Sequence, residues 1–352
     1  MSIDKKTNNL DPQKRGEDVS LDLALRPKNF DEYVGQDKVK RNLKILIEAA
    51  KKRNEPIEHI LFHGPAGLGK TTLAHLVAKE MNSQIKITSG PAISKVGDLV
   101  AIILRLEEGD ILFIDEIHRL SKLIEEILYP AMESRAIDFV SGKGPSAQSY
   151  HLPLKPFTLV AATTRTSLLS SPLRSRFSGG SFRLDFYIIE DIEKIISRNA
   201  KILCVETKPE AVKIIASRSR FTPRIANRLL KRARDYAEVK GEGVITAKLA
   251  EDALNLLEID HLGLESVDRR ILETIITKFN GGPVGAGTLA AAMMEEVETI
   301  EEVYEPYLMQ LGFLDRTPRG RCATSRAYEH LGLTPPSFPA SGQKINKNLF
   351  NC

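Results

Sequence analysis

Residues 59–74 join an apolar run, a glycine-rich turn and the beginning of a helical pattern. His59–Phe62 is the run, Thr72-Leu73-Ala74 opens the helical pattern, and between them stands Gly64-Pro65-Ala66-Gly67-Leu68-Gly69-Lys70-Thr71, which matches GxxxxGK[ST]. Glycines such as Gly64, Gly67 and Gly69 allow backbone N–H groups to surround phosphate oxygens at the start of a helix. The segment therefore predicts a nucleotide-binding loop in an α/β domain, and a chance glycine-rich turn is the alternative.

Two side chains of this loop and two carboxylates have a defined chemistry. Lys70 is expected to reach the β- and γ-phosphate oxygens, and the Thr71 hydroxyl is placed to bind Mg²⁺. The apolar run Ile111–Ile114 ends in Asp115 and Glu116, and Asp115 stands 45 residues after Lys70 (115 minus 70). We expect Asp115 to hold Mg²⁺ and Glu116 to act as the base on water. A plain acidic cap after a strand is the alternative.

Apolar runs and helical patterns alternate between residues 36 and 183. Phe157–Val160 adds a third apolar run, so the region predicts a parallel sheet with crossover helices. Residues 138–154 have the pattern strand, turn and strand, which predicts an inserted β-hairpin. After Tyr187 helical patterns replace the strands, and from about residue 267 helices are followed by a short hairpin. This last arrangement indicates a winged helix.

The chain of 352 residues is long enough for two or three domains. We place a large α/β domain at 21–183, a small helical domain at 184–262 and a winged-helix domain at 263–334. Residues 1–20 and 335–352 are polar, lack apolar periodicity and are expected to be flexible.

The net charge of +4 is too small for a protein coated in nucleic acid, so any DNA contact should be a local patch. The three cysteines, Cys204, Cys322 and Cys352, form no CxxC pair, so neither a disulfide framework nor a zinc site is indicated. A reducing cytoplasm suits this pattern, and no apolar run approaches the roughly 18 residues that a membrane span needs.

Further polar residues stand where a ring ATPase needs them. The strand Phe157–Ala162 leads into Thr163 and Thr164, which can sense a γ-phosphate. The loop Pro172–Phe177 carries two arginines, and one of them can reach the nucleotide of a neighbouring subunit. Arg224 follows Thr222-Pro223 at the start of a helix, where it can bridge to the phosphates. For each arginine alone, an ordinary surface residue or ion-pair partner is the alternative. No NKxD sequence occurs, so GTP is not supported.

Taken together, the segments GPAGLGKTT, LFIDEIHRL, AATTR, SPLRSRF and FTPRIANRLL resemble the AAA+ ATPases, and their exact letters resemble the RuvB family. The resemblance extends from Leu25-Arg26-Pro27 to Arg316–Arg321, which is nearly the whole folded chain. It implies a homohexameric ATP- and Mg²⁺-dependent motor that drives branch migration of Holliday junctions in recombination and repair.

The resemblance also implies roles for individual residues. Arg176 is similar to the arginine finger, and Thr163 and Thr164 to sensor 1. The segment Glu133-Ser134-Arg135 would lie near nucleotide, although the family commonly has an acidic-aromatic pair after that glutamate. The nucleotide pocket would be formed by Leu25, Arg26, Tyr33, Val34, Gly67, Lys70, Thr71, Thr72, Tyr187 and Arg224.

Partners follow from the same resemblance. The hairpin at 138–154 resembles the family's docking element for a RuvA-type junction-binding protein, and a bare structural hairpin is the alternative. A RuvC-type resolvase is a further possible partner, and the duplex arms of four-way junctions are the expected DNA.

Arg316, Arg319, Arg321 and Arg326 fall within eleven residues that contain no acid after Asp315. Such a cluster is expected to contact DNA phosphates without reading sequence, mainly through Arg316, Arg319 and Arg321. A solvated basic loop is the alternative. Val297 stands where the family often has another arginine, so DNA affinity is expected to be weaker.

Two other functions share part of this pattern. A clamp loader or initiator of the AAA+ class has the same ATPase motifs but would not need the arginine-rich hairpin. A scaffold that binds ATP without turnover would not need Glu116 and Arg176.

Overall fold

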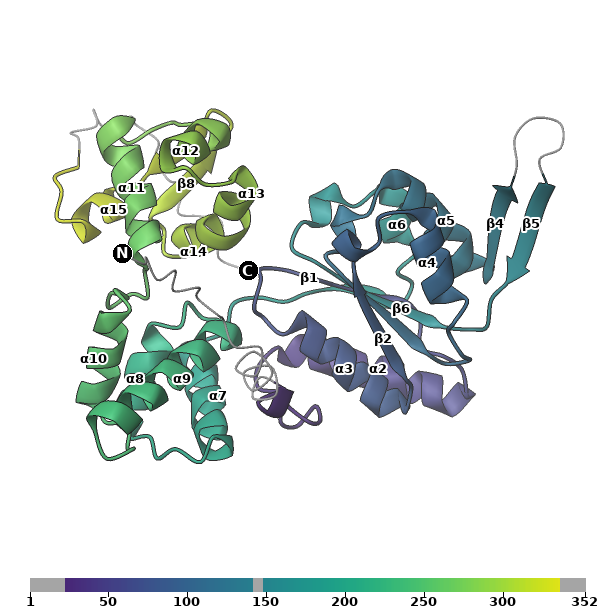
Figure 1. Ribbon diagram of the computed structural model, residues 1–352, viewed down its shortest axis with the longest axis horizontal. Coiled ribbons are helices and arrows are strands. Elements are labelled where there is room, and N and C mark those ends of the chain that lie inside the picture. Colours follow the sequence, from purple (N-terminus) through teal and green to yellow (C-terminus); the bar gives the residue numbers. More distant parts are fainter. Residues whose placement is uncertain (1–22, 142–147, 336–352) are drawn as a thin grey trace, which may run out of the picture. The chain divides into compact units, whose positions relative to one another are not determined.

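A computed structural model describes residues 23–141 and 148–335 of the chain (Figure 1). The chain forms two compact units, Met1–Gly263 and Leu264–Cys352. Two segments are expected to be flexible, 1–20 and 335–352. The first lies outside the described residues, as does the second except for residue 335, and so does the expected turn Gly142–Ser146. Among the residues described, no helix is both long and apolar enough to cross a membrane.

The first unit is built on a five-stranded parallel sheet in the order β2-β3-β6-β1-β7. Strands β3 and β6 are buried almost throughout because their runs are apolar on both sides, as crossover helices on both faces require. The strands span β1 Ile60–His63, β2 Ile85–Ser89, β3 Ile111–Asp115, β6 Thr158–Thr163 and β7 Gly180–Arg183.

Helices cover both faces of this sheet, with α2 and α3 on one side and α4, α5 and α6 on the other (Figure 1). Side chains of β3 alternate between the faces: Phe113 joins the core under α2 and α3, whereas Leu112 and Ile114 join the core under α4 and α5. These helices span α2 Asp37–Arg53, α3 Lys70–Met81, α4 Val96–Ile103, α5 Lys122–Glu133 and α6 Ser171–Ser175.

The inserted hairpin is present as an antiparallel pair, β4 Ala136–Ser141 and β5 Gln148–Pro153. It begins two residues before the expected position 138 (138 minus 136) and ends at 153. The pair extends from α5 and returns to the sheet (Figure 1).

After β7, the described part of the first unit continues with the helices α7 Ile189–Ile202, α8 Pro209–Ser217, α9 Pro223–Lys240 and α10 Ala247–Leu256. Proline stands at the first position of α8 and of α9, where its missing N–H costs nothing. The apolar faces of α7, α8 and α9 share one continuous core with α2, α3 and the sheet. This shared core holds α7, α8 and α9 against the domain that contains the sheet.

The second unit contains the short hairpin β8 Leu314–Thr317 and β9 Gly320–Ala323, with Arg316 opposite Arg321. A capping box between Glu265 and the buried Asp268 starts α11. The helices of this unit are α11 Ser266–Lys278, α12 Ala286–Met293, α13 Val297–Thr299, the π-helix η5 Ile300–Tyr304, α14 Glu305–Gln310 and α15 Ser325–His330. The parallel sheet with its crossover helices, the helices that follow it and the hairpin of the second unit agree with the predicted fold class, an α/β domain with a helical lid and a winged helix.

Candidate active site

The glycine-rich loop joins β1 to α3, as its position between an apolar run and a helical pattern predicts. The Gly64 N–H donates to the Thr163 carbonyl at 3.2 Å, which fixes the loop to β6. The Lys70 ammonium is buried and donates to the carbonyl oxygens of Gly64 and Pro65, both at 2.8 Å. Lys70 therefore lies folded along the loop that it is expected to serve.

The two expected Mg²⁺ ligands meet at the carboxyl edge of the sheet. The Thr71 hydroxyl donates to Asp115 Oδ2 at 3.3 Å, although the residues are 44 positions apart. Hydroxyl and carboxylate oxygens are hard donors of the kind Mg²⁺ prefers, so this pair fits the ion.

Glu116 leaves strand β3 in the left-handed conformation, with φ of +48°. This conformation costs a residue with a side chain about 1–3 kcal/mol and is common at functional sites. The Glu116 carboxylate lies 3.4 Å from the Arg119 guanidinium, and its side chain is 43% exposed. Glu116 is therefore accessible to water beside Asp115.

The two threonines at the end of β6 occupy different environments. Thr163 is fully buried, and its hydroxyl accepts from the Arg165 N–H and bonds with the His118 ring, both at 3.0 Å. Thr164 is only partly buried. Thr163 thus connects β6 to the segment after Glu116, and Thr164 is the better placed of the two for contact with a ligand.

Two buried tyrosines, Tyr33 and Tyr187, contact the phosphate loop at the Leu68 carbonyl. The Tyr33 hydroxyl donates to the Leu68 carbonyl at 3.2 Å, and the Tyr187 hydroxyl lies 3.1 Å from Tyr33 Oη. Burial raises the pKa of Tyr187 to about 12 and raises the pKa of Tyr33 well above its usual value, so both phenols stay protonated. Gly69 has φ of +94°, and a Cβ there would lie 2.7 Å from Tyr33 Oη, so this position requires glycine.

A pocket opens beside the tyrosines, between the start of the described chain and the lid helices α7 and α9. Seven of the predicted nucleotide residues line it: Leu25, Arg26, Tyr33, Val34, Gly69, Thr72 and Tyr187. Sequence reasoning missed the other lining residues, which are Pro27, Glu32, Ile195, Arg198, Asn199, Pro223 and Asn227. Three of them had a local signal, because Pro27 stands in Leu25-Arg26-Pro27 and both Pro223 and Asn227 stand within the segment FTPRIANRLL.

Arg224 is brought to the phosphate loop by the start of α9. Its backbone N–H donates to the Gly67 carbonyl at 3.4 Å, and a Cβ on Gly67 would lie 3.1 Å from Arg224 Cβ. The N-terminus of α9, with its partial positive charge, thus faces the region expected to bind phosphate.

Arg176 lies at the C-terminal end of α6, next to Glu133 at the C-terminal end of α5. Its guanidinium contacts Glu133 at 3.0 Å and the Pro172 carbonyl at 2.7 Å, and stacks 4.5 Å above the Tyr129 ring. Of the segment 133–135, which is expected to lie near nucleotide, Glu133 therefore contacts Arg176. Ser134 closes the end of α5 by donating to the Pro130 carbonyl at 2.9 Å.

Three families of known domains match this chain. The model of the Holliday junction DNA helicase RuvB P-loop domain matches residues 25–183, the RuvB AAA lid domain matches 187–260, and the RuvB C-terminal winged helix domain matches 261–332. The chain belongs to the RuvB family.

Curated relatives cover nearly all of the chain. It is 56% identical over 345 residues to the Holliday junction branch migration complex subunit RuvB of Chloroflexus aurantiacus, covering 97% of each protein. The RuvB subunit of Dehalococcoides mccartyi is 57% identical over 331 residues, covering 94% of this chain and 93% of the relative.

Solved RuvB structures have the same fold. The Thermotoga maritima RuvB Holliday junction branch migration motor superposes with a TM-score of 0.82 at 50% identity, covering 89% of this chain and 100% of that one. A mutant of the same Thermotoga protein gives a TM-score of 0.83 at 50% identity, covering 89% and 99%.

In the RuvB winged-helix domain of this chain, the predicted DNA-binding arginines differ in exposure. Arg321 is 7% exposed, and its guanidinium donates to Glu305 at 2.6 Å and Glu301 at 2.7 Å. Burial lowers the pKa of the Arg321 guanidinium, but the hydrogen bonds to Glu305 and Glu301 outweigh burial, so the pKa is raised. Arg316 remains 54% exposed beside Glu301, and Arg319 is exposed at the turn. Arg321 thus supports the hairpin from within, and its expected contact with DNA phosphates stays a prediction.

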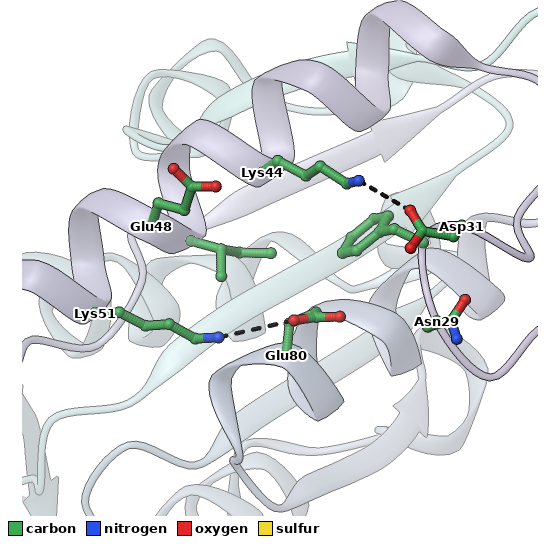
Figure 2. A pocket seen from close by; sticks show the side chains of 8 residues that line it. Asn29, Asp31, Lys44, Glu48, Lys51 and Glu80 are labelled. Carbon is green, nitrogen blue, oxygen red and sulfur yellow. Dashed lines mark hydrogen bonds and ion pairs between the residues drawn. The ribbon is translucent and has the colours of Figure 1, made fainter.

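A separate hollow lies between α2 and α3, and its lining residues differ from those of the pocket beside Tyr33 and Tyr187. Figure 2 shows Lys44 paired with Asp31 at 3.1 Å and Lys51 paired with Glu80 at 3.7 Å along its sides. None of its lining residues belongs to the phosphate loop or the carboxylate pair. We assign it no part in nucleotide binding.

The two environments in the wing lead to opposite expectations. Arg321→Ala leaves Glu301 and Glu305 without their buried partner, so it should lower the free energy of unfolding of the winged-helix domain by about 3–5 kcal/mol. Arg319→Ala should leave stability unchanged and lower the slope of log K for duplex DNA against log salt by about one. Denaturant unfolding and salt-titrated DNA binding measure the two effects. An Arg321→Ala protein of unchanged stability with a reduced salt slope would make Arg321 a phosphate contact instead.

Proposed function

We propose that this protein is the ATP-hydrolysing motor subunit that drives branch migration of Holliday junctions. One observation carries the proposal: RuvB family models match all three domains, in a chain whose phosphate loop, Thr71–Asp115 pair and Glu116 are intact. Its relatives in Chloroflexus and Dehalococcoides are named as subunits of the Holliday junction branch migration complex.

Lys70 and Thr71 receive the triphosphate in this proposal. The Lys70 ammonium exchanges its bonds to the Gly64 and Pro65 carbonyls for bonds to β- and γ-phosphate oxygens. Thr71 and Asp115 hold Mg²⁺, which when bound neutralises charge on the phosphates. Loop N–H groups and the start of α9 with Arg224 add further positive potential around the same phosphates.

Glu116 orients the attacking water and accepts its proton. Its exposed position next to Asp115, at the carboxyl edge of the sheet and close to the proposed metal ligands, supports this role. Thr164 donates a hydrogen bond to the γ-phosphate, while Thr163 and His118 hold the end of β6 in place.

Arg176 serves the nucleotide of an adjacent subunit in a homohexamer. Its contacts are with Glu133, Pro172 and Tyr129, on helices α5 and α6, and not with its own phosphate loop. An arginine delivered from a neighbour makes hydrolysis depend on ring assembly and stabilises charge in the transition state. Glu133, which is adjacent to Arg176, then lies near the same neighbouring nucleotide.

DNA and protein partners complete the proposal. The exposed Arg316 and Arg319 contact the phosphates of duplex arms, which suits movement along any sequence. The β4–β5 hairpin binds a RuvA-type junction protein, and a RuvC-type resolvase acts on the same junctions. The protein works in the cytoplasm, where it reaches chromosomal DNA.

A clamp loader or initiator shares the ATPase chemistry but is less well supported. The match of residues 261–332 to the RuvB winged-helix family favours a junction motor, because this domain is the part in which the two functions differ.

Substitutions in the phosphate loop and at the base should separate binding from hydrolysis. Lys70→Ala should abolish ATP binding, because the phosphates lose their main positive side chain. Glu116→Gln should bind ATP as the unaltered protein does, yet hydrolyse it at least about 100-fold more slowly, the typical contribution of a general base. Calorimetric binding and steady-state phosphate release measure both, with Glu126→Gln on the exposed side of α5 as control. Normal turnover by Glu116→Gln would remove Glu116 from the mechanism.

Mixed oligomers test whether Arg176 acts between subunits. Arg176→Ala alone and Glu116→Gln alone should each hydrolyse ATP poorly. A mixture should regain part of the activity, because some interfaces combine an intact Glu116 with an intact Arg176 from its neighbour. Arg174 is an exposed arginine of α6, two residues before Arg176, and Arg174→Ala should behave like the unaltered protein. Mixtures that stay inactive would mean that Arg176 acts within its own chain.

The overall function is tested on synthetic four-way junctions. We expect ATP-dependent dissociation of a junction by this protein with a RuvA-type partner, and none with Glu116→Gln. Gel separation of junction and duplex products, with phosphate release measured in the same samples, gives the result. Hydrolysis that is indifferent to junction and partner would instead favour the clamp-loader-like alternative.

A further inference from the structure

Three polar residues form a hydrogen-bonded series along the lid wall of the nucleotide pocket. Arg198 NH1 donates to Asn199 Oδ1 at 2.8 Å, and Asn199 Nδ2 donates to Asn227 Oδ1 at 2.6 Å. Arg198 is itself held by Glu32 at 2.7 Å and by the Leu25 carbonyl at 3.0 Å. The series therefore starts at the chain segment before the phosphate loop and ends on α9.

The chemistry of the donors fixes the direction of this series. A guanidinium has no acceptor, so the Asn199 atom that faces Arg198 must be its carbonyl oxygen. The other arm of Asn199 is then its NH₂ group, which only donates. The Asn227 atom that faces it must in turn be the carbonyl oxygen, so the remaining arm of Asn227 is its NH₂ group.

The NH₂ group of Asn227 is a donor at the pocket wall. Asn199 is 1% exposed, whereas Asn227 is only partly buried and lines the pocket. Within the described residues Asn227 Nδ2 has no hydrogen-bond partner. The atom is not buried, so solvent or a ligand can reach it. The donor is thus oriented by its neighbours and open to a ligand.

We propose that Asn227 recognises the purine base by donating a hydrogen bond to one of its ring nitrogens. The inference rests on the proposed ATP binding and deepens it, because it names a residue that reads the base. Leu25, Val34 and Pro223 give the pocket apolar walls that suit a flat ring, and Gly69 and Thr72 mark its side toward the phosphate loop. The unsubstituted ring nitrogens N1, N3 and N7 of adenine accept hydrogen bonds within such a ring.

A nearly isosteric substitution isolates this donor. Asn227→Asp keeps an oxygen for Asn199 Nδ2 and replaces the NH₂ group with a second acceptor. We would measure calorimetrically the binding of ADP and of its 1-deaza, 3-deaza and 7-deaza analogues to the full chain. The unaltered protein should bind one analogue about five- to tenfold more weakly than ADP, as the loss of one hydrogen bond predicts. In Asn227→Asp that ratio should fall to about one.

The ratio of affinities cancels a uniform effect of the added negative charge on the diphosphate. Asn255→Asp on α10, outside the pocket, adds the same charge and should keep the unaltered ratio. Asn227→Leu, which removes the amide without adding charge, should lose the ratio as well and replaces Asn227→Asp if that variant does not fold.

The outcomes separate the inference from the proposed function. Suppose that the unaltered protein binds ADP and that every Asn227 variant shows the same affinity ratios for the three analogues as the unaltered protein. Asn227 then does not read the base, and the inference is wrong. A chain that binds no ADP at all would overturn the proposed function, and the inference with it.

Discussion

The site depends on the alignment of carboxyl ends in a parallel sheet. Strand β1 delivers the phosphate loop, β3 delivers Asp115 and Glu116, and β6 delivers Thr163 and Thr164 to one edge. The contact of Thr71 with Asp115 at 3.3 Å results from this alignment, because it joins α3, the helix after β1, to the end of β3. Burial of the strands on both faces makes the register costly to change, so the edge is rigid.

The lid extends this rigid edge into a pocket. One apolar core continues from the sheet into α7, α8 and α9, so the lid shares its packing with the nucleotide-binding domain. The Tyr187 and Arg224 backbones then reach Phe221 and Gly67. Arg198 ties the lid to the segment before the loop through the Leu25 carbonyl. The lid is therefore joined to the phosphate loop and to the segment before it through backbone contacts as well as side chains.

Much of this architecture was predictable, and the limits have physical causes. The strands β1, β3 and β6 were predicted because buried parallel strands are continuous apolar runs. Edge strands β2 and β7 were not, since Ile85–Ser89 and Gly180–Arg183 are only partly buried and carry polar residues. The positions of the phosphate loop and carboxylates followed from local motifs. Pocket residues such as Arg198 and Asn199 had no motif, because their role arises from contacts across distant segments.

The sequence by itself determined the family, the fold class and the residues of the phosphate loop, because these are encoded in short contiguous patterns with fixed chemistry. Tertiary structure decided what each long polar side chain contacts. Arg321 and Arg319 are two positions apart in one basic cluster, yet one is buried between Glu301 and Glu305 and the other is exposed. The partners of Arg321 come from η5 and α14, more than a dozen residues earlier in the chain. The free energy of burying a charge depends on such partners and not on neighbours in sequence.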